Sequence, residues 1–183
     1  DEGRVVHRGK WVRTQLLCQY VPPLSSVMVQ AKVGPSAPDK TARDRVVEAT
    51  EQPLCQGCHS LMNPLGFPFE MFNHAGFLRA TDHGHAPDGS SVLENMPDPA
   101  LDGPVKDAVE LSEKLAQSPY VERCFLRQAF RYFMGRDETE ADACTLAAME
   151  QAYDGQGGSL QAALAALFTS ETFLYRASAE VTP

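Results

Sequence analysis

Two cysteines and a histidine stand close together in the stretch CQGCH, as Cys55, Cys58 and His59. Two cysteines three positions apart can each form a thioether to a vinyl group on one side of a porphyrin, and the adjacent histidine can then bind the iron. This spacing is the attachment pattern of a c-type haem. We therefore expect one covalent haem, anchored by Cys55 and Cys58, with His59 as an axial iron ligand.

Two other kinds of site could use the same residues. A thioredoxin-like dithiol needs a strand–helix–strand context, which the surrounding sequence does not provide. A structural zinc ion needs four ligands, and the other close pair in the chain, His83 and His85, flanks an expected turn. Haem attachment is the preferred interpretation, and zinc binding and dithiol chemistry stay as alternatives.

The sixth iron position could be filled by methionine or histidine, which are the usual ligands. Met96 is the first candidate, because it lies in the proline-bounded loop ENMP just ahead of an expected helix. Met134, at the end of another expected helix, is the second candidate, and an open position is the third possibility. Met62 is excluded, because it follows His59 by three residues and should lie on the same side of the haem.

Three further cysteines are present, Cys18, Cys124 and Cys144. Cys124 and Cys144 each lie ten residues from Met134, close to a turn expected at Gly135. Residues equidistant from the turn of an antiparallel helical hairpin face each other, so we predict a Cys124–Cys144 disulfide. An oxidising compartment, which c-type haem attachment also implies, would preserve it. The alternative is two buried free thiols, and Cys18 is expected to be a buried thiol.

The elements that position these residues are predicted to be mainly helical. Apolar spacing predicts a helix over 7–18, and Thr41 or Asp39 can begin another that runs to about Glu51. Between them, residues 20–38 are predicted to form an extended surface segment. Helices are also predicted over 104–117, 119–134, 139–153 and 159–176.

The region that follows the haem motif is less regular. The residues Asn63-Pro64-Leu65-Gly66 give a strong turn signal, and a short helix is predicted over 67–74. A small hairpin is predicted over 77–93 and a loop with three prolines over 94–104. The predicted fold class is mainly α: a c-type cytochrome-like helical domain around one haem, with a small β-hairpin and a C-terminal helical bundle.

The chain has 183 residues and a formal net charge of −8. This length fits a haem-binding module over 1–100 and a helical module over 101–183 packed on it. The acidity disfavours nucleic acid and favours a basic redox partner. No run approaches the roughly 18 apolar residues of a membrane span. The start, DEGR, is no signal peptide, so we expect a mature or excised fragment.

The stretch CQGCHSLMNPLGFPFEMFNHAGFLR resembles the haem-bearing module of large exported bacterial proteins, domain of unknown function 1588. In that family the haem histidine is followed by a short spacer, Asp-Pro-x-Gly-Phe, then Glu, Phe, Asp, Gly and a closing Arg. The matching positions here are Asn63, Pro64, Gly66, Phe67, Glu70, Phe72, Asn73, Gly76 and Arg79. Two family aspartates are therefore asparagines here. Upstream, RGKWVRTQLLCQYVPPL resembles the family's Arg-Gly opening and proline run.

The last third resembles a companion module, domain of unknown function 1585. CFLRQAFRYFMGR is similar to its Tyr-x-x-Gly-Arg signature, on Tyr132, Gly135 and Arg136. SETFLYR is similar to its closing Ser-x-x-Phe-x-x-Arg, on Ser170, Phe173 and Arg176. The two resemblances imply the C-terminal part of a longer bacterial protein that is periplasmic or otherwise exported, and they supply no substrate.

The matching positions near the haem motif give further candidates for cofactor binding: Pro64, Gly66, Phe67 and Arg79. Gly66 would permit tight backbone near the haem. Arg79 and Arg136 could pair with haem propionates, because a guanidinium fork suits carboxylates. The alternative for each is an ordinary salt bridge, with Glu70 or Asp137.

Three functions are compatible with one attached haem. A module with both axial positions filled transfers single electrons to and from a redox partner protein or domain. A peroxidase-like enzyme needs an open distal site and a polar acid–base group. A structural or docking module would use the haem mainly to stabilise its fold. Nothing resembles the distal Arg-His arrangement of peroxidases, so electron transfer is preferred and the other two functions stay as alternatives.

Overall fold

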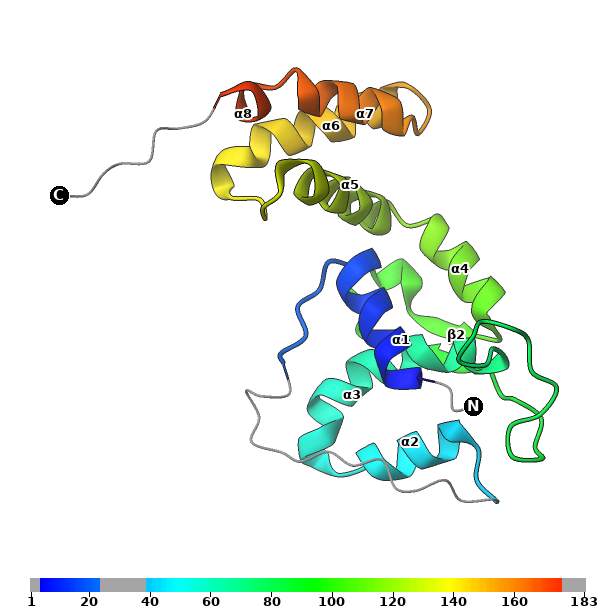
Figure 1. Cartoon of the computed structure of the whole chain (residues 1–183). Helices are drawn as coiled ribbons and strands as arrows, with labels where there is room; N and C mark the ends of the chain where they lie inside the picture. Colours follow the sequence, from blue (N-terminus) through cyan, green and yellow to red (C-terminus); the bar gives the residue numbers. More distant parts are fainter. Residues whose placement is uncertain (1–3, 24–38, 176–183) are drawn as a thin grey trace. The chain divides into compact units, whose positions relative to one another are not determined.

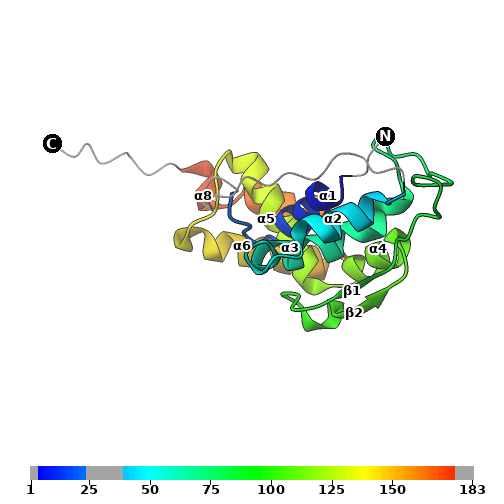
Figure 2. The same cartoon turned by 90° about the horizontal axis from the view of Figure 1, so that it is seen from below.

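The computed structural model describes residues 4–23 and 39–175 of the chain. It is mainly helical and contains one small two-stranded sheet in this described part (Figures 1 and 2). The chain forms two compact units, residues 1–121 and 122–183. Most of the extended segment predicted over 20–38, and also Arg176, lie outside the described residues. No helix of the described part is long and apolar enough to cross a membrane.

The first unit begins with α1 (Val5–Trp11), which packs on α3 (Pro53–Gly66). A π-helical stretch over 12–16 extends α1, so the helix predicted over 7–18 is confirmed and begins slightly earlier. Two glycines permit the close approach of the helices. A Cβ atom on Gly9 would lie 1.8 Å from the Met62 carbonyl oxygen, and one on Gly66 would lie 2.1 Å from that of Val5. Gly66 thus provides tight backbone packing against α1.

Replacing Gly9 by alanine is expected to destabilise the protein by about 1–3 kcal/mol, because the added methyl group must push α1 and α3 apart. The matched control is Gly57→Ala, since a Cβ atom at Gly57 on α3 meets nothing within 4 Å. The control should stabilise by up to about 1 kcal/mol, the usual advantage of alanine over glycine in a helix. Urea unfolding measures both changes, and equal stabilities would contradict the assigned role of Gly9.

Helix α2 (Ala42–Thr50) begins as predicted at Thr41. The Thr41 hydroxyl accepts a hydrogen bond from the Asp44 N–H, and the Asp44 carboxylate accepts one from the Thr41 N–H. This reciprocal pair satisfies two backbone donors at the helix start. In α3, by contrast, the turn predicted at residues 63–66 is wrong, because the helix continues through Pro64 to Gly66. Burial of the adjacent Leu65 in the core outweighs the hydrogen bond that Pro64 cannot donate.

A short 3₁₀ helix (Phe67–Met71) follows α3, as predicted. The hairpin predicted over 77–93 is wrong: strand β1 (Ser91–Leu93) pairs antiparallel with β2 (Gly103–Val105), across the proline-rich loop. Leu93 and Val105 both enter the core, and this shared burial selects the pairing. The unit ends with α4 (Ala108–Ala116) and the start of α5. Its core consists of Val12, Leu17, Leu65, Leu93, Met96, Leu101, Val105, Leu111 and Leu115.

In the second unit, all regular secondary structure of the residues described, 122–175, is helical. The unit holds most of α5 (Pro119–Met134), α6 (Ala143–Gly155), α7 (Leu160–Phe168) and α8 (Glu171–Leu174). The bounds of α5 agree with the prediction, with a proline in the first turn. The single helix predicted over 159–176 is divided, because Ser170 leaves the helical conformation and its hydroxyl accepts from the Phe173 N–H to begin α8. The core consists of Leu126, Phe130, Met149, Ala163 and Leu167.

Asp142 joins α5 to α6 in this second unit, and its side chain is 2% exposed. Its carboxylate accepts hydrogen bonds from both terminal nitrogens of Arg136, at 2.7 and 2.8 Å, and from the N–H and hydroxyl of Thr139. The bonds from Arg136 are the main reason that the pKa of Asp142 lies well below its ordinary value. Of the alternatives for Arg136, the structure shows a salt bridge, and its carboxylate partner is Asp142.

We expect the stability that Asp142 contributes to be present above about pH 4 and lost as the pH falls, because the unfolded carboxyl binds a proton more readily than the folded one. Asp142→Asn should lower the free energy of unfolding by about 2 kcal/mol near pH 7 and by much less near pH 3. Asp137→Asn is the control, because the Asp137 side chain is exposed and pairs with Arg131 only at 3.4 Å. Chemical unfolding at the two pH values measures the effect, and a loss independent of pH would contradict it.

Candidate functional site

The predicted haem anchors lie on α3, in its first two turns. Cys55, Cys58 and His59 occupy positions i, i+3 and i+4 of the helix, so their side chains share one face. All three are half-buried, and both cysteines are free thiols rather than a disulfide. A planar ring that bonds to two thiols and one imidazole needs these groups on one accessible face. The donor set on α3 therefore fits a c-type haem.

A pocket of about 240 Å³ lies beside His59, between α2, α3 and the loop around β1. Two candidates from the sequence, Pro64 and Phe67, line it together with His59. Val47 on α2 and Val92 on β1 add apolar side chains that are 47% and 55% exposed. The Phe67 ring lies 4.2 Å from the Arg43 guanidinium carbon, a cation–π contact that fixes the ring. The pocket thus has an apolar side, and polar residues that include Thr50, Asn63 and Asn95 complete its lining.

A chain of hydrogen bonds connects His59 to α2. His59 Nδ1 lies 3.1 Å from Asn63 Oδ1, and Asn63 Nδ2 donates to the Thr50 hydroxyl at 3.1 Å. That hydroxyl donates to the Val46 carbonyl oxygen at 2.7 Å. The sequence identified Asn63 only as part of a turn signal and as a position in a resemblance. Its spacing of four residues from His59 on a helix is the signal that could have revealed the contact.

Of the two candidate sixth ligands, one lies in a core and the other packs against one. Met96 is buried in the core of the first unit, and its sulfur lies 3.8 Å from Arg13 Nη1. Its neighbour Asn95 lines the pocket beside His59, whereas the Met96 side chain is in the core. Met134 packs against the core of the second unit. As iron ligands, both stay predictions.

Arg79 belongs to a buried group of charges. Its Nη2 lies 2.8 Å from a carboxylate oxygen of Glu70, and its Nη1 lies 3.0 Å from Asp82. Arg8 approaches the other Glu70 oxygen at 3.8 Å. Burial raises the pKa of Glu70 above its ordinary value, and the charges of Arg79 and Arg8 oppose that rise. Of the two alternatives for Arg79, the structure shows the salt bridge with Glu70.

The predicted Cys124–Cys144 disulfide is wrong. Cys18 and Cys124 are the disulfide-bonded cysteines, and Cys144 is a free, exposed thiol. The prediction assumed that the helical hairpin is symmetric about Gly135. Instead α6 starts only at Ala143, which places Cys144 in its first turn with its side chain exposed, whereas Cys124 is buried. The expectation that Cys18 is a buried thiol is also wrong, because Cys18 is disulfide-bonded.

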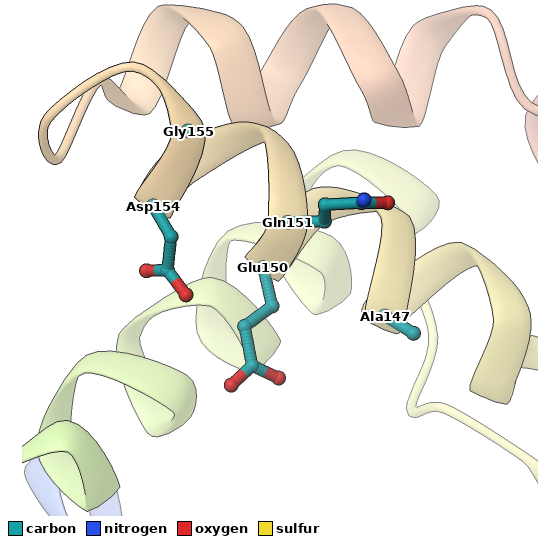
Figure 3. A pocket seen from close by; sticks show the side chains of 5 residues that line it. All are labelled: Ala147, Glu150, Gln151, Asp154 and Gly155. Atoms are coloured by element: carbon teal, nitrogen blue, oxygen red, sulfur yellow. The ribbon is translucent and has the colours of Figure 1, made fainter.

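A larger and more open hollow, of about 560 Å³, lies along α6 and contains none of the predicted site residues. Figure 3 shows the carboxylates of Glu150 and Asp154 extending to the same side of this helix. The Glu150 carboxylate pairs with Arg123 of α5, which offsets part of the negative charge. Burial and then a hydrogen bond with Asp154 raise the pKa of Glu122. No group of three or more His, Cys, Asp or Glu side chains in the described part could hold a metal ion.

Comparison with known families gives two matches. Residues 1–82 match the model of a family described as a protein of unknown function (DUF1588), and residues 103–173 match one described in the same words (DUF1585). The two families and their order agree with the resemblances seen in the sequence. The predicted boundary between residues 100 and 101 lies in the stretch between the two matches. No curated protein and no solved structure matches the chain.

Proposed function

We propose that this chain is a monohaem c-type cytochrome module that transfers single electrons as part of a larger exported redox protein. The observation that carries the proposal is the placement of Cys55, Cys58 and His59 on one face of α3, with both thiols free. The mainly helical fold of the first unit supports the cytochrome-like character of the module.

Each of these residues has a distinct task. The thiols of Cys55 and Cys58 would hold the haem covalently, each through a thioether to one vinyl group. His59 would bind the iron through its other ring nitrogen, since its Nδ1 is the atom that lies beside Asn63 Oδ1. The bound haem supplies a one-electron couple at its iron. Val47, Val92 and Phe67 would contact the ring beside His59.

Met96 remains the proposed sixth ligand, because Asn95 and the preceding Glu94 already line the pocket beside His59. Ligation would take the thioether away from Arg13 and out of the core. If Met96 binds the iron, Met96→Leu removes the methionine–iron absorption band and lowers the reduction potential. If Met96 is only a core residue, this substitution of similar volume leaves the spectrum unchanged.

Two properties of the whole chain support its proposed place and partner. Disulfide-bonded Cys18 and Cys124 suit an oxidising compartment such as the periplasm. The formal net charge of −8 favours a redox partner with a basic docking surface. We propose that the chain receives and passes electrons there by transient contact with such a partner protein or domain.

Expression of the chain in the bacterial periplasm together with a c-type haem maturation system tests the proposal. We expect the purified protein to carry one haem that survives denaturing electrophoresis, and to be reduced by dithionite and reoxidised reversibly. The intact mass should exceed that of the polypeptide by one haem. A folded product with formed disulfides but without covalent haem would refute the proposed function.

A further inference from the structure

Asn63 lies inside the protein between the candidate iron ligand and α2, and each end of its amide has a partner. It is 6% exposed, and the neighbouring Thr50 is 5% exposed. On one side the amide oxygen faces His59 Nδ1, and on the other its nitrogen faces the Thr50 hydroxyl, both at 3.1 Å. The amide is therefore held at two points and shielded from competing water.

The donor and acceptor of each hydrogen bond in this series follow from the Val46 carbonyl, where the series ends. The Val46 carbonyl can only accept, so the single hydroxyl proton of Thr50 points to it. The Thr50 oxygen is then free only to accept, which turns the Asn63 NH₂ group toward it. The Asn63 oxygen is left facing His59, and an oxygen there can only accept a proton. His59 must therefore carry its proton on Nδ1, and Nε2 keeps the lone pair.

A further contact holds the two helices in this arrangement. Gln56, one turn before His59 on α3, donates from its amide to the Thr50 carbonyl at 2.7 Å. The end of α2 is thus attached to α3 both through the backbone and through the side chain of Thr50. This double attachment fixes the distance between the Thr50 hydroxyl and Asn63.

We propose that the chain Val46–Thr50–Asn63 sets the tautomer and ring orientation of His59, which makes Asn63 a positioning residue for the iron ligand. Its relevance to iron rests on the proposed function, whereas the tautomer is a property of the polypeptide. A ligand histidine that donates its second N–H to an oxygen is a stronger base and stabilises the oxidised iron. Loss of the Asn63 bond therefore raises the reduction potential.

The first measurement uses the full chain without haem, labelled with ¹⁵N in its histidines and studied in alkaline buffer. We expect the ¹⁵N shifts of His59 to show the proton on Nδ1. Thr50→Val keeps the shape of the side chain but removes the hydroxyl, and should shift the population toward the Nε2–H tautomer. Thr50→Ser restores the hydroxyl and should restore the wild-type ratio. A wild-type His59 protonated mainly on Nε2, or one ratio in all three proteins, would overturn the proposal.

The second measurement uses the haem-loaded protein, the same two Thr50 variants and one further variant, Asn63→Leu. We expect Thr50→Val to raise the reduction potential and Asn63→Leu to raise it further, with Thr50→Ser close to the wild type. Equal potentials in all four proteins would show that Asn63 does not act on the iron ligand. If neither the wild type nor any variant binds haem covalently, the proposed function is refuted instead. The tautomer measurement then still tests whether the hydrogen bonds through Thr50 and Asn63 set the tautomer of His59.

Discussion

Replacing Cys55 and Cys58 together by alanine is expected to remove all covalently bound haem, because no thioether can then form at the α3 face. Each single replacement should leave one thioether and therefore a reduced amount of attached haem. Both thiols are free and half-buried, so neither substitution breaks a disulfide or opens a core cavity. Haem staining after denaturing electrophoresis measures the loss directly.

The chain provides its own control for this experiment. Cys144 is also a free thiol, but it is exposed in the first turn of α6, in the other compact unit. Cys144→Ala should keep the full amount of covalent haem. Covalent haem that persists in the double variant, or that disappears in Cys144→Ala, would contradict the assignment of the attachment residues.

Local signals in the sequence were sufficient to predict several helices. Thr41 with Asp44 three residues later marks the start of α2, and Pro119 marks the start of α5, because each satisfies or avoids a backbone donor at a helix end. Long-range packing was not predictable in this way. Pro64 continues a helix because Leu65 is buried in the core, and Leu93 pairs across a loop with Gly103 because their strands flank that core.

In the candidate site, too, local features were predictable from the sequence and long-range contacts were not. The grouping of Cys55 and His59 was available from their spacing in the sequence, whereas the helix that places them on one face was not predicted. The bond between Asn63 and Thr50 joins two helices, and nothing in the spacing of those two residues indicates it. The position of Met96 is a second example, because its loop context suggested a ligand while its side chain packs in the core.

Replacing Glu70 by alanine is expected to destabilise the protein by about 3–5 kcal/mol, because the substitution removes one partner of a buried ion pair. The Glu70 side chain is 1% exposed, and its carboxylate oxygens lie 2.8 Å from Arg79 and 3.8 Å from Arg8. Both guanidinium groups would lose this compensating charge inside the first unit. Asp82 would still neutralise part of the charge of Arg79, which is why the loss should not exceed this range.

The matched control is Glu70→Gln, which keeps the shape of the side chain and an oxygen that can accept from Arg79. It should lose less stability than Glu70→Ala, because the cavity is avoided and one hydrogen bond to the guanidinium group survives. Urea unfolding of the three proteins near pH 7 measures both differences. Arg79 also donates from Nε to the Glu70 backbone carbonyl at 2.6 Å, a bond that neither substitution removes. A loss below about 1 kcal/mol for Glu70→Ala would therefore mean that this backbone bond and Asp82 suffice to hold Arg79, and that the carboxylate of Glu70 contributes little to the fold.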